Sequence, residues 1–489
     1  MSKAQTGPAR SPSAAFCLGL ASFSLLLGTG ACRSAGDSGP PVTVDRTGGT
    51  TGSGGRTGSG GARAGSGGTN NTGGSTGNGG ATSTGGSMSP PGTGGSTGDA
   101  GRPDAADASS APDATRDTSP DSSTPPTPAG PTDLTKYRYT KVLRFNTTAT
   151  GANITANVEK YPLAILLNAT NFDFMQAKAN GEDIRFAKAD GTILPHAIEL
   201  WDRAAATAAV WVKVDHILGN SNTQTIQMFW GFEGAVDASD SKAVFPQADG
   251  FVGVYHLGEE GNTTAGGYKD ASSHEAHATG LNLMPDARVD GRIGKATNLA
   301  NPAGGMPASR WIRMDTPDKL TPFNTLPVGQ PISISIWTKA TSYPNSYVTI
   351  MSKGDTSWTL QRFSTTNQYE PCVQARSGTM DYHLCTPSTA RTAANTWVHF
   401  GVVFQEPRFL FYVNGVLDSM TSAGPWNKGE HAFGIGNQTQ FNARRFWDGI
   451  MDEARVMRAA RSVSWFKLDY ESQREGQKLL TFGPTQTRS

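Results

Sequence analysis

The chain has 489 residues, and its 42 lysines and arginines nearly balance 41 aspartates and glutamates, giving a formal net charge of +1. It has no basic stripe of the kind that a phosphate backbone requires, so nucleic acid is excluded as an expected partner. The chain has 59 glycines, more than the usual share, and the excess is concentrated before residue 130, which leaves roughly residues 133–484 for folded domains.

The N-terminus has the pattern of an export signal. Lys3 and Arg10 precede an apolar run, AAFCLGLASFSLLL, which is too short for an ordinary membrane span and is followed by the small residues GTGA. These small residues before Cys32 resemble the lipobox of bacterial lipoproteins, in which the signal is cleaved before a cysteine that becomes lipidated. The resemblance implies a signal peptide over residues 1–31, lipidation of Cys32, and anchoring in the bacterial cell envelope, at the outer membrane or cell surface. Because Thr29 stands where leucine is usual, ordinary cleavage and secretion stay an alternative.

Residues 32–132 have the composition of a tether. Their first part is rich in Gly, Ser and Thr, and their second part is rich in Asp, Ala, Pro and Ser. Neither part has enough apolar surface to offset the entropy of ordering, so we expect this segment to be disordered.

Residues 133–240 predict a small antiparallel β-sandwich. Apolar residues alternate with polar ones in short runs that are separated by Gly, Asn and Asp, as is typical of strands and turns. The expected strands are 139–145, 161–167, 183–189, 193–201, 208–214 and 225–230. A single helical turn is expected within 172–179.

The first module is similar to a bacterial surface domain of unknown function. The resemblance rests on NGEDIRFAKADGT, LPHAIELWD and AAVWVKV, which occur in that order, and it covers nearly all of residues 137–235. It implies a topology and no activity.

Residues 251–484 predict a second all-β module, a jelly roll of two packed sheets. Nine or more strand candidates are separated by Gly, Asn, Asp and Pro. Asn414 and Gly415 predict a tight hairpin turn. One helix is expected from Trp465 to Glu471, with Ser464 as its N-cap.

Cys372 and Cys385 are the two cysteines within the expected folded region. If Gly378 and Thr379 form a hairpin turn, the cysteines fall directly opposite one another on antiparallel strands. We therefore predict a disulfide, with free thiols as the alternative.

The second module resembles a laminin-G-like, concanavalin A-like jelly roll. The motifs are GVYHLGE, KDASSHEAHAT, PISISIWTKA, NTWVHFGVVF, FLFYVNGVLDS and WDGIMDEARVMRAARSVSWFKLDYESQ, in that order. The resemblance implies binding of glycans or extracellular proteins, often with a structural calcium ion. It also implies that Asp270, in the early loop, and Asp452, in the late strand, share that calcium; His274, Glu275 and His277 depart from the loop pattern of the family.

The strand WDGIMDEARV places carboxylates on an otherwise apolar face, because Asp448 and Asp452 alternate with Ile450. The β-glucan hydrolases of this fold resemble one another in carrying three carboxylates at this spacing, and here the middle one is missing, so we expect no catalytic residues and no enzyme. Two alternatives remain for Asp452: a calcium ligand or an acceptor of backbone hydrogen bonds. On the other face, Glu453 and Arg455 can form an ion pair or line a groove, and a surface ion pair is the more frequent case.

Aromatic residues in or beside loops are candidates for ligand stacking, because sugar rings pack on their apolar faces. They are Trp426, Tyr343, Tyr347 and Tyr382. Together these observations predict an exported, lipid-anchored binding protein for carbohydrate or another extracellular polymer or protein. A glycoside hydrolase or polysaccharide lyase of the same fold and a structural spacer without ligand are the alternatives.

Overall fold

The computed structural model describes residues 132–489 except 302–308, 325–329, 378–379, 423–425, 427–428, 430 and 441–444. The expected signal peptide, Cys32 and nearly all of the tether lie outside these residues. The described residues fall within one compact unit, Asp117–Ser489. Within them, no helix has the length and apolar character needed to cross a bilayer.

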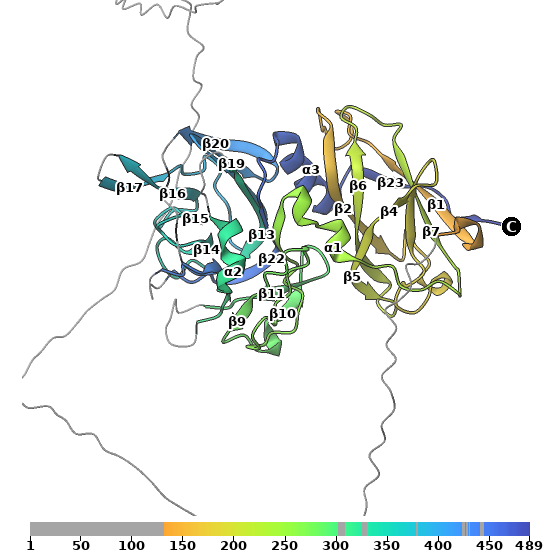
Figure 1. Cartoon of the computed structure of the whole chain (residues 1–489), viewed down its shortest axis with the longest axis horizontal. Coiled ribbons are helices and arrows are strands. Elements are labelled where there is room, and N and C mark those ends of the chain that lie inside the picture. Colours follow the sequence, from red (N-terminus) through yellow and green to blue (C-terminus); the bar gives the residue numbers. More distant parts are fainter. Residues whose placement is uncertain are drawn as a thin grey trace, which may run out of the picture. The chain divides into compact units, whose positions relative to one another are not determined.

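The first module is an antiparallel β-sandwich, drawn in orange to yellow-green in Figure 1. One sheet has three strands in the order β2-β6-β5, with bounds β2 Val158–Asn168, β6 Thr207–Ile217 and β5 His196–Asp202. The facing sheet contains β1 Tyr139–Phe145, β7 Thr225–Trp230, β3 Arg185–Lys188 and β4 Ile193–Leu194. The run expected as one strand at 193–201 divides into β4 and β5 around Pro195, whose nitrogen cannot donate to a ladder.

Two strands from the end of the chain complete the first sandwich. β23 Leu480–Phe482 and β24 Gln486–Thr487 both pair with β1, on the edge opposite β7. The expected second module extended to residue 484, but its last strand belongs to the sheet of the first module. The N-terminal and C-terminal segments of the described chain are thus neighbours in one sheet (Figure 1).

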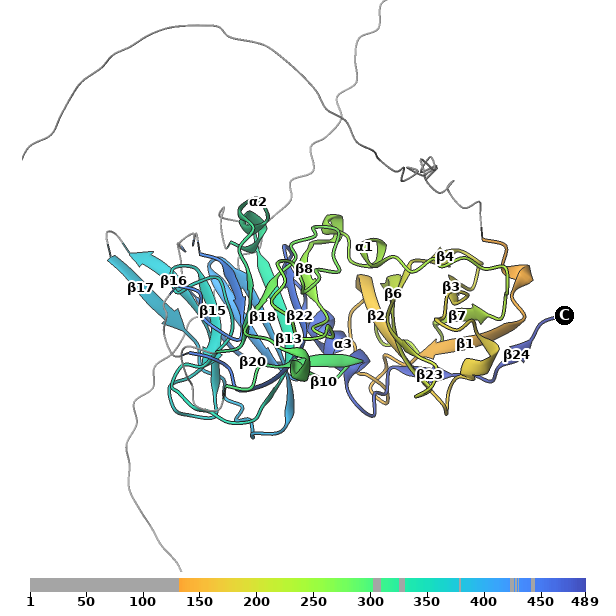
Figure 2. The same ribbon diagram turned by 90° about the horizontal axis from the view of Figure 1, so that it is seen from below.

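The second module is a jelly roll of two antiparallel sheets, which confirms the all-β prediction (Figure 2). The sheet of eight strands contains β10 Arg288–Asp290, β11 Lys295–Asn298, β22 Gly449–Met457, β13 Ile332–Ala340, β18 Trp397–Gln405, β19 Arg408–Val413, β20 Val416–Ser422 and β8 Phe251–Tyr255. The sheet of seven contains β17 Met380–Cys385, β16 Tyr369–Ser377, β15 Trp358–Arg362, β14 Thr349–Ser352, β21 Phe433–Ile435, β12 Trp311–Met314 and β9 Thr279–Leu281. Their facing sides enclose an apolar core.

Short helical segments connect the strands. The 3-10 helices are Leu134–Lys136, Phe174–Gln176, Gln247–Asp249, Pro285–Ala287 and Thr321–Phe323. The α-helices are α1 Ser241–Val244, α2 Pro317–Leu320 and α3 Val463–Gln473. The Phe174–Gln176 helix lies where the sequence predicted a helical turn.

Two local predictions in the second module are confirmed. Val413 pairs with Val416 around the Asn414–Gly415 turn, and both turn residues have positive φ, as the tight hairpin requires. Cys372 and Cys385 lie opposite one another on β16 and β17 and form a disulfide.

Helix α3 joins the two modules. Figures 1 and 2 show it between the sandwiches, beside β2. Its buried Trp465, Phe466 and Leu468 belong to the hydrophobic cluster that fills the first sandwich and extends into the second module. The helix begins two residues earlier than predicted, and Ser462 rather than Ser464 caps it by accepting from the Trp465 N–H. The two modules therefore share one core.

Leu479→Ala tests whether the end of the chain stabilises this shared core. Leu479 is fully buried in the cluster, so we expect the substitution to lower the free energy of unfolding by about 2–5 kcal/mol. Val416→Ala is the control, because Val416 is exposed and its truncation is expected to change stability by less than about 0.5 kcal/mol. Thermal unfolding followed by near- and far-ultraviolet circular dichroism should show a single transition at the lowered temperature; two separate transitions would contradict a shared core.

Candidate functional site at the interface of the two sandwiches

A β-bulge in β22 redirects the acidic strand. Its pairing with β13 steps from Asp452 opposite Trp337 to Arg455 opposite Ser335, so that Glu453 and Ala454 face a single residue. Glu453 has φ 52°, an uncommon conformation for a residue with a side chain. Asp452, Glu453 and Arg455 are all buried, and the predicted surface pair of Glu453 with Arg455 is corrected to a buried one, because the bulge breaks the alternation of faces.

A second β-bulge lies in β5 of the first module. Ile198 pairs with Val210 and Leu200 pairs with Ala209, which leaves Glu199 without a partner in the ladder. Its carboxylate accepts a hydrogen bond of 2.7 Å from Trp211 Nε1. Bulges turn side chains out of the regular alternation and are frequent beside functional sites.

The two redirected glutamates meet at His256, which follows β8. His256 Nδ1 lies 2.7 Å from Glu453 Oε1 and 3.4 Å from Glu199 Oε2. The imidazole also stacks on the indole of Trp211, with 5.7 Å between ring centroids. One histidine and two carboxylates, contributed by both modules, thus form a single cluster in which Glu453 is buried and Glu199 and His256 are partly buried.

This cluster continues into a buried network of charges. Arg455 donates to Glu453 and to Asp469, each at 2.7 Å, and its guanidinium lies 4.5 Å from the ring centroid of Trp211. Asp469 also lies within 3.0 Å of His399 Nε2. Paired charges therefore join strand β22 to helix α3, and the contact of the Arg455 guanidinium with Trp211 extends this network to the first module.

Neighbouring charges and burial change the pKa values of the cluster. Burial, together with Glu453, raises the pKa of Glu199 to about 8, although His256 acts in the opposite direction. Burial disfavours the imidazolium form of His256, but the carboxylates of Glu453 and Glu199 raise its pKa to about 9. Burial also acts to raise the pKa of Glu453, but His256 and Arg455 outweigh it and lower the pKa.

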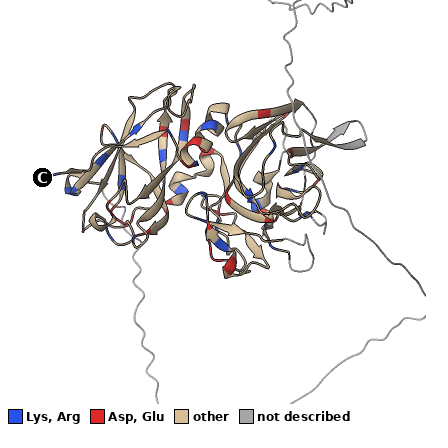
Figure 3. Cartoon of the chain, turned by 180° about the vertical axis from the view of Figure 1, so that it is seen from behind, with Lys and Arg blue, Asp and Glu red and all other residues tan. Residues whose placement is uncertain are grey.

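Glu199 and His256 line a cavity of about 470 Å³ between the modules. Ile198 and Leu200 supply an apolar wall. The charged residues around it have both signs: Lys242, Lys269, Arg288, Lys295, Glu259, Asp270 and Glu275. Figure 3 likewise shows acidic and basic residues interspersed over both sandwiches. A cavity of this size and mixed character can hold a small polar ligand.

Glu259 lines the cavity, and one of its two carboxylate oxygens accepts no hydrogen bond from the described residues. Its Oε1 accepts from the Lys269 N–H at 2.8 Å, whereas its buried Oε2 has no hydrogen-bond partner among the described residues. Burial raises its pKa. Glu260, the next residue, is exposed.

Asp270 and Asp452 accept hydrogen bonds from separate parts of the chain. Asp270 accepts from the backbone of Val254, Ser272 and Ala276 and from the Ser272 hydroxyl, all at 2.8 Å. Its carboxylate fastens the 270–276 loop to β8.

Asp452 Oδ2 accepts from the backbone N–H groups of Arg292 and Ile293 at 2.6 and 2.9 Å. Burial first, and then Glu453 and Glu199, raise the pKa of Asp452. Backbone acceptance, one of the two alternatives for Asp452, is thus observed, and calcium shared with Asp270 stays a prediction.

The aromatic candidates differ in their exposure. Trp426 lies in the core near Phe404 and Phe409 and is 4% exposed, so it offers no face to a ligand. Tyr347 is exposed and lies near Arg445, while Tyr343 is half-buried beneath the guanidinium of Arg362. The side chain of Tyr382 lies outside the described part of the structure.

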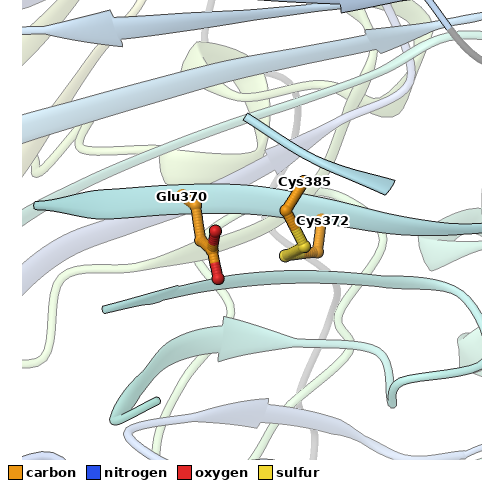
Figure 4. Close-up of side chains that lie close together, drawn as sticks. All are labelled: Glu370, Cys372 and Cys385. Carbon is orange, nitrogen blue, oxygen red and sulfur yellow. A yellow bond between two sulfur atoms is a disulfide. The ribbon is translucent and has the colours of Figure 1, made fainter. Parts of the chain in front are cut away.

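Figure 4 shows a second group of possible metal-binding side chains, Glu370, Cys372 and Cys385, on β16 and β17. The two sulfur atoms are bonded to one another, so they cannot act as thiolate ligands. Glu370 accepts from Gln361 Nε2 at 3.0 Å.

The sequence did not single out Glu199 or His256. Glu199 stands between Ile198 and Leu200 and His256 between Tyr255 and Leu257, and polar residues at these places are usual on the solvent side of a strand. The signal that was present is local: in AIELW two apolar residues stand on each side of Glu199, so apolar and polar residues do not strictly alternate there. Glu199 and His256 come close to Glu453 only because segments that are distant in the sequence pack together.

Two family models match the chain. Residues 315–465 match the concanavalin A-like lectin/glucanases superfamily, and residues 180–257 match a domain of unknown function, DUF2341. No curated protein matches the sequence.

Several solved structures align with about half of the chain. The binding domain of Paraclostridial Mosquitocidal Protein 1 is 14% identical over 46% of this chain and 52% of its own, with a TM-score of 0.35. Domain 4 of an extracellular arabinanase from Geobacillus stearothermophilus, in complex with arabinotriose, is 18% identical over 45% of this chain and 97% of its own, with a TM-score of 0.30. The ligand binding domain of botulinum neurotoxin serotype D, in complex with N-acetylneuraminic acid, is 14% identical over 48% of this chain and 53% of its own, with a TM-score of 0.33. This chain thus spans about half the length of the two toxin chains.

Gly294→Ala tests the packing of the Glu199 carboxyl group. Gly294 has φ 49°, and a Cβ there would lie 2.8 Å from Glu199 Oε1. We expect the substitution to displace this carboxyl and to lower the free energy of unfolding by about 1–3 kcal/mol. Gly476→Ala is the matched control, because Gly476 has φ 62° but a Cβ there would meet no described atom within 4 Å. Equal losses in both variants, measured by denaturant unfolding, would show that backbone strain alone is responsible.

The pKa values of Glu199 and His256 predict how stability depends on pH. The folded state retains the Glu199 proton between about pH 4.5 and 8 and the His256 proton between about pH 6.5 and 9, while the unfolded chain has lost them. Because the folded state then binds more protons, the contribution of both groups to stability falls as pH rises through this window. Melting temperatures measured from pH 5 to 9 with chelator present should fall less steeply for Glu199→Gln than for the unchanged protein. Parallel curves would contradict the raised pKa of Glu199.

Proposed function

Because this chain carries a concanavalin A-like domain joined to a domain of unknown function, we propose that it is a cell-surface binding protein that recognises carbohydrate or a related surface polymer. The observation that carries the proposal is the cavity of about 470 Å³ between the two modules. A sugar presents hydroxyl groups that donate and accept hydrogen bonds, together with an apolar ring face. The cavity provides partners for both kinds of surface.

The polar groups of the cavity suit hydroxyl recognition. The free Oε2 of Glu259 is an acceptor, and the protonated carboxyl of Glu199 has a hydrogen to donate below about pH 8. Lys242, Lys269, Arg288 and Lys295 are donors around the same space, and Ile198 and Leu200 provide the apolar contact. Several directed polar groups beside an apolar wall are what orients a small ligand in its pocket.

The N-terminal pattern supports a surface location. We propose that the signal over residues 1–31 is cleaved, that Cys32 is lipidated, and that the segment up to residue 132 holds the folded unit away from the membrane. Acyl chains contribute about 0.8 kcal/mol per buried methylene, so a multiply acylated cysteine would anchor the protein stably. Mass spectrometry of the mature protein would detect the lipid, and an unmodified N-terminus after cleavage elsewhere would favour secretion.

Two measurements, glycan binding and sugar release, distinguish a binding protein from a hydrolase and from a spacer. A glycan array probed with the full-length chain reports binding, and reducing-sugar release from the same glycans reports hydrolysis. We expect binding without release. Release that is lost in Asp452→Asn or Glu453→Gln would establish a hydrolase instead, and the absence of both binding and release would leave the spacer interpretation.

Glu259→Gln tests whether the cavity is the binding site. Loss of a charged acceptor should weaken glycan binding by at least about tenfold, because a hydrogen bond to a charged group contributes about 1.5–3 kcal/mol. Glu260→Gln is the control, since the neighbouring side chain is exposed and does not line the cavity. Titration calorimetry measures both affinities. If Glu259→Gln leaves affinity unchanged while Tyr347→Ala abolishes it, the ligand binds at the exposed tyrosine and the cavity assignment fails.

A further inference from the structure

The cluster of Glu199, His256 and Glu453 at the wall of the cavity has the composition of a metal site. One oxygen or nitrogen atom from each of the three side chains lies within 4.8 Å of the others. Two of these side chains are placed by β-bulges in different modules, in β5 and β22. A histidine with two carboxylates is a ligand set for a divalent transition metal, whereas calcium prefers oxygen ligands alone.

The spacing of the three atoms is close to what coordination requires. Zinc binds nitrogen and carboxylate oxygen at about 2.0–2.2 Å, so neighbouring ligand atoms in a tetrahedral site lie roughly 3.3 Å apart. His256 Nδ1 and Glu199 Oε2 are already 3.4 Å apart, and His256 Nδ1 and Glu453 Oε1, at 2.7 Å, would separate by about 0.6 Å. These are adjustments of side-chain torsion rather than of the fold.

We propose that Glu199, His256 and Glu453 bind one divalent transition-metal ion of the zinc class, with a remaining coordination position open to the cavity. This site is distinct from the calcium predicted at Asp270 and Asp452, and it does not require that the cavity recognise sugar.

Outer hydrogen bonds hold both carboxylates in the orientation that the proposal needs. Trp211 Nε1 donates at 2.7 Å to Glu199 Oε2, the oxygen that faces His256, and Arg455 Nη2 donates to Glu453 Oε2 at 2.7 Å, which leaves Glu453 Oε1 directed at the histidine. Such partners fix the orientation of metal ligands and contribute strongly to affinity. Trp211 also stacks on the imidazole and restrains the ring.

The charge of the buried site changes little when the metal binds. The ion takes the place of protons on His256 Nδ1 and on the Glu199 carboxyl, and these protons leave to solvent as coordinate bonds form from the nitrogen and oxygen lone pairs. No electron is transferred, so no oxidant or reductant is needed. Because metal and protons compete for the same atoms, affinity should fall as pH is lowered.

Metal binding is tested with zinc alone on the full-length chain. After treatment with chelator and dialysis, titration calorimetry at pH 7.5 should show one zinc ion bound per chain, and binding should weaken at pH 6. Titrations in two buffers of different ionisation enthalpy should report proton release. Cobalt(II) should give visible absorption bands of a site with nitrogen and oxygen ligands.

Glu199→Gln and His256→Gln identify the ligands. Each should weaken zinc binding by at least about 100-fold, because loss of a ligand exceeds the 10–100-fold effect typical of its outer partners. His383→Gln and Glu370→Gln are the controls: His383 is exposed on β17, and Glu370 is buried outside the cluster. Circular dichroism shows whether each variant is folded. If His256→Gln does not fold, Glu199→Gln still tests the site, because it keeps the shape of the side chain.

The proposal is overturned if the folded protein binds no stoichiometric zinc between pH 6 and 9. It is also overturned if Glu199→Gln and His256→Gln bind zinc as tightly as the controls. Because zinc is measured without glycan, failure of this proposal is separate from failure of carbohydrate recognition.

Discussion

The buried guanidinium of Arg455 is the group on which the junction of the two modules depends, because it pairs with Glu453 and Asp469 of the second module and lies 4.5 Å from the ring centroid of Trp211 in the first. All three charged side chains are buried, and each distance from the guanidinium to a carboxylate is 2.7 Å. Removing one partner of such a buried group leaves an uncompensated charge, at a cost of about 3–5 kcal/mol. Strand β22 and helix α3 must therefore keep their positions for these charges to stay paired, and the Tyr161 hydroxyl of the first sandwich donates to the same Asp469 carboxylate at 3.3 Å.

This constraint extends through hydrogen bonds that cross the junction. The Tyr161 hydroxyl of β2 lies 2.9 Å from the Ser472 hydroxyl of α3, and Gln473 bridges Asp469 and Trp337 at 2.7 Å each. The first module thus contacts the jelly roll through polar groups that are specific in position, over an apolar core that is continuous. Such a junction favours a fixed geometry over a hinge. The residues of both modules that line the adjacent cavity are therefore held in fixed positions relative to one another.

Much of the fold could be predicted from local sequence because strands, tight turns and a short cysteine loop leave local signals. β1 and β7 have the bounds expected from alternation. The predicted tight hairpin forms at Asn414–Gly415, and the predicted disulfide forms between Cys372 and Cys385. The site was not predictable in the same way. A bulge shifts the alternation by one residue, so Glu453, expected on a surface, is buried, and only the folded chain brings it to His256 and Glu199. Trp426 illustrates the reverse error: flanking glycine, proline and asparagine suggest a loop, yet tertiary packing buries the indole.

The pairing of β1 with β23 and β24 also determines when the first sandwich can be completed during synthesis. Arg488 donates to the carbonyl oxygen of Leu134, 354 residues earlier, and β1 acquires its second neighbour from the same late segment. During synthesis the first sandwich therefore emerges from the ribosome with an open edge and stays incomplete until the entire jelly roll has followed it. Contacts so distant along the chain close slowly, because a long loop must be ordered before they form. The sheet of the first module is complete only when the segment that follows the jelly roll has been made, and until then one edge of β1 is unpaired.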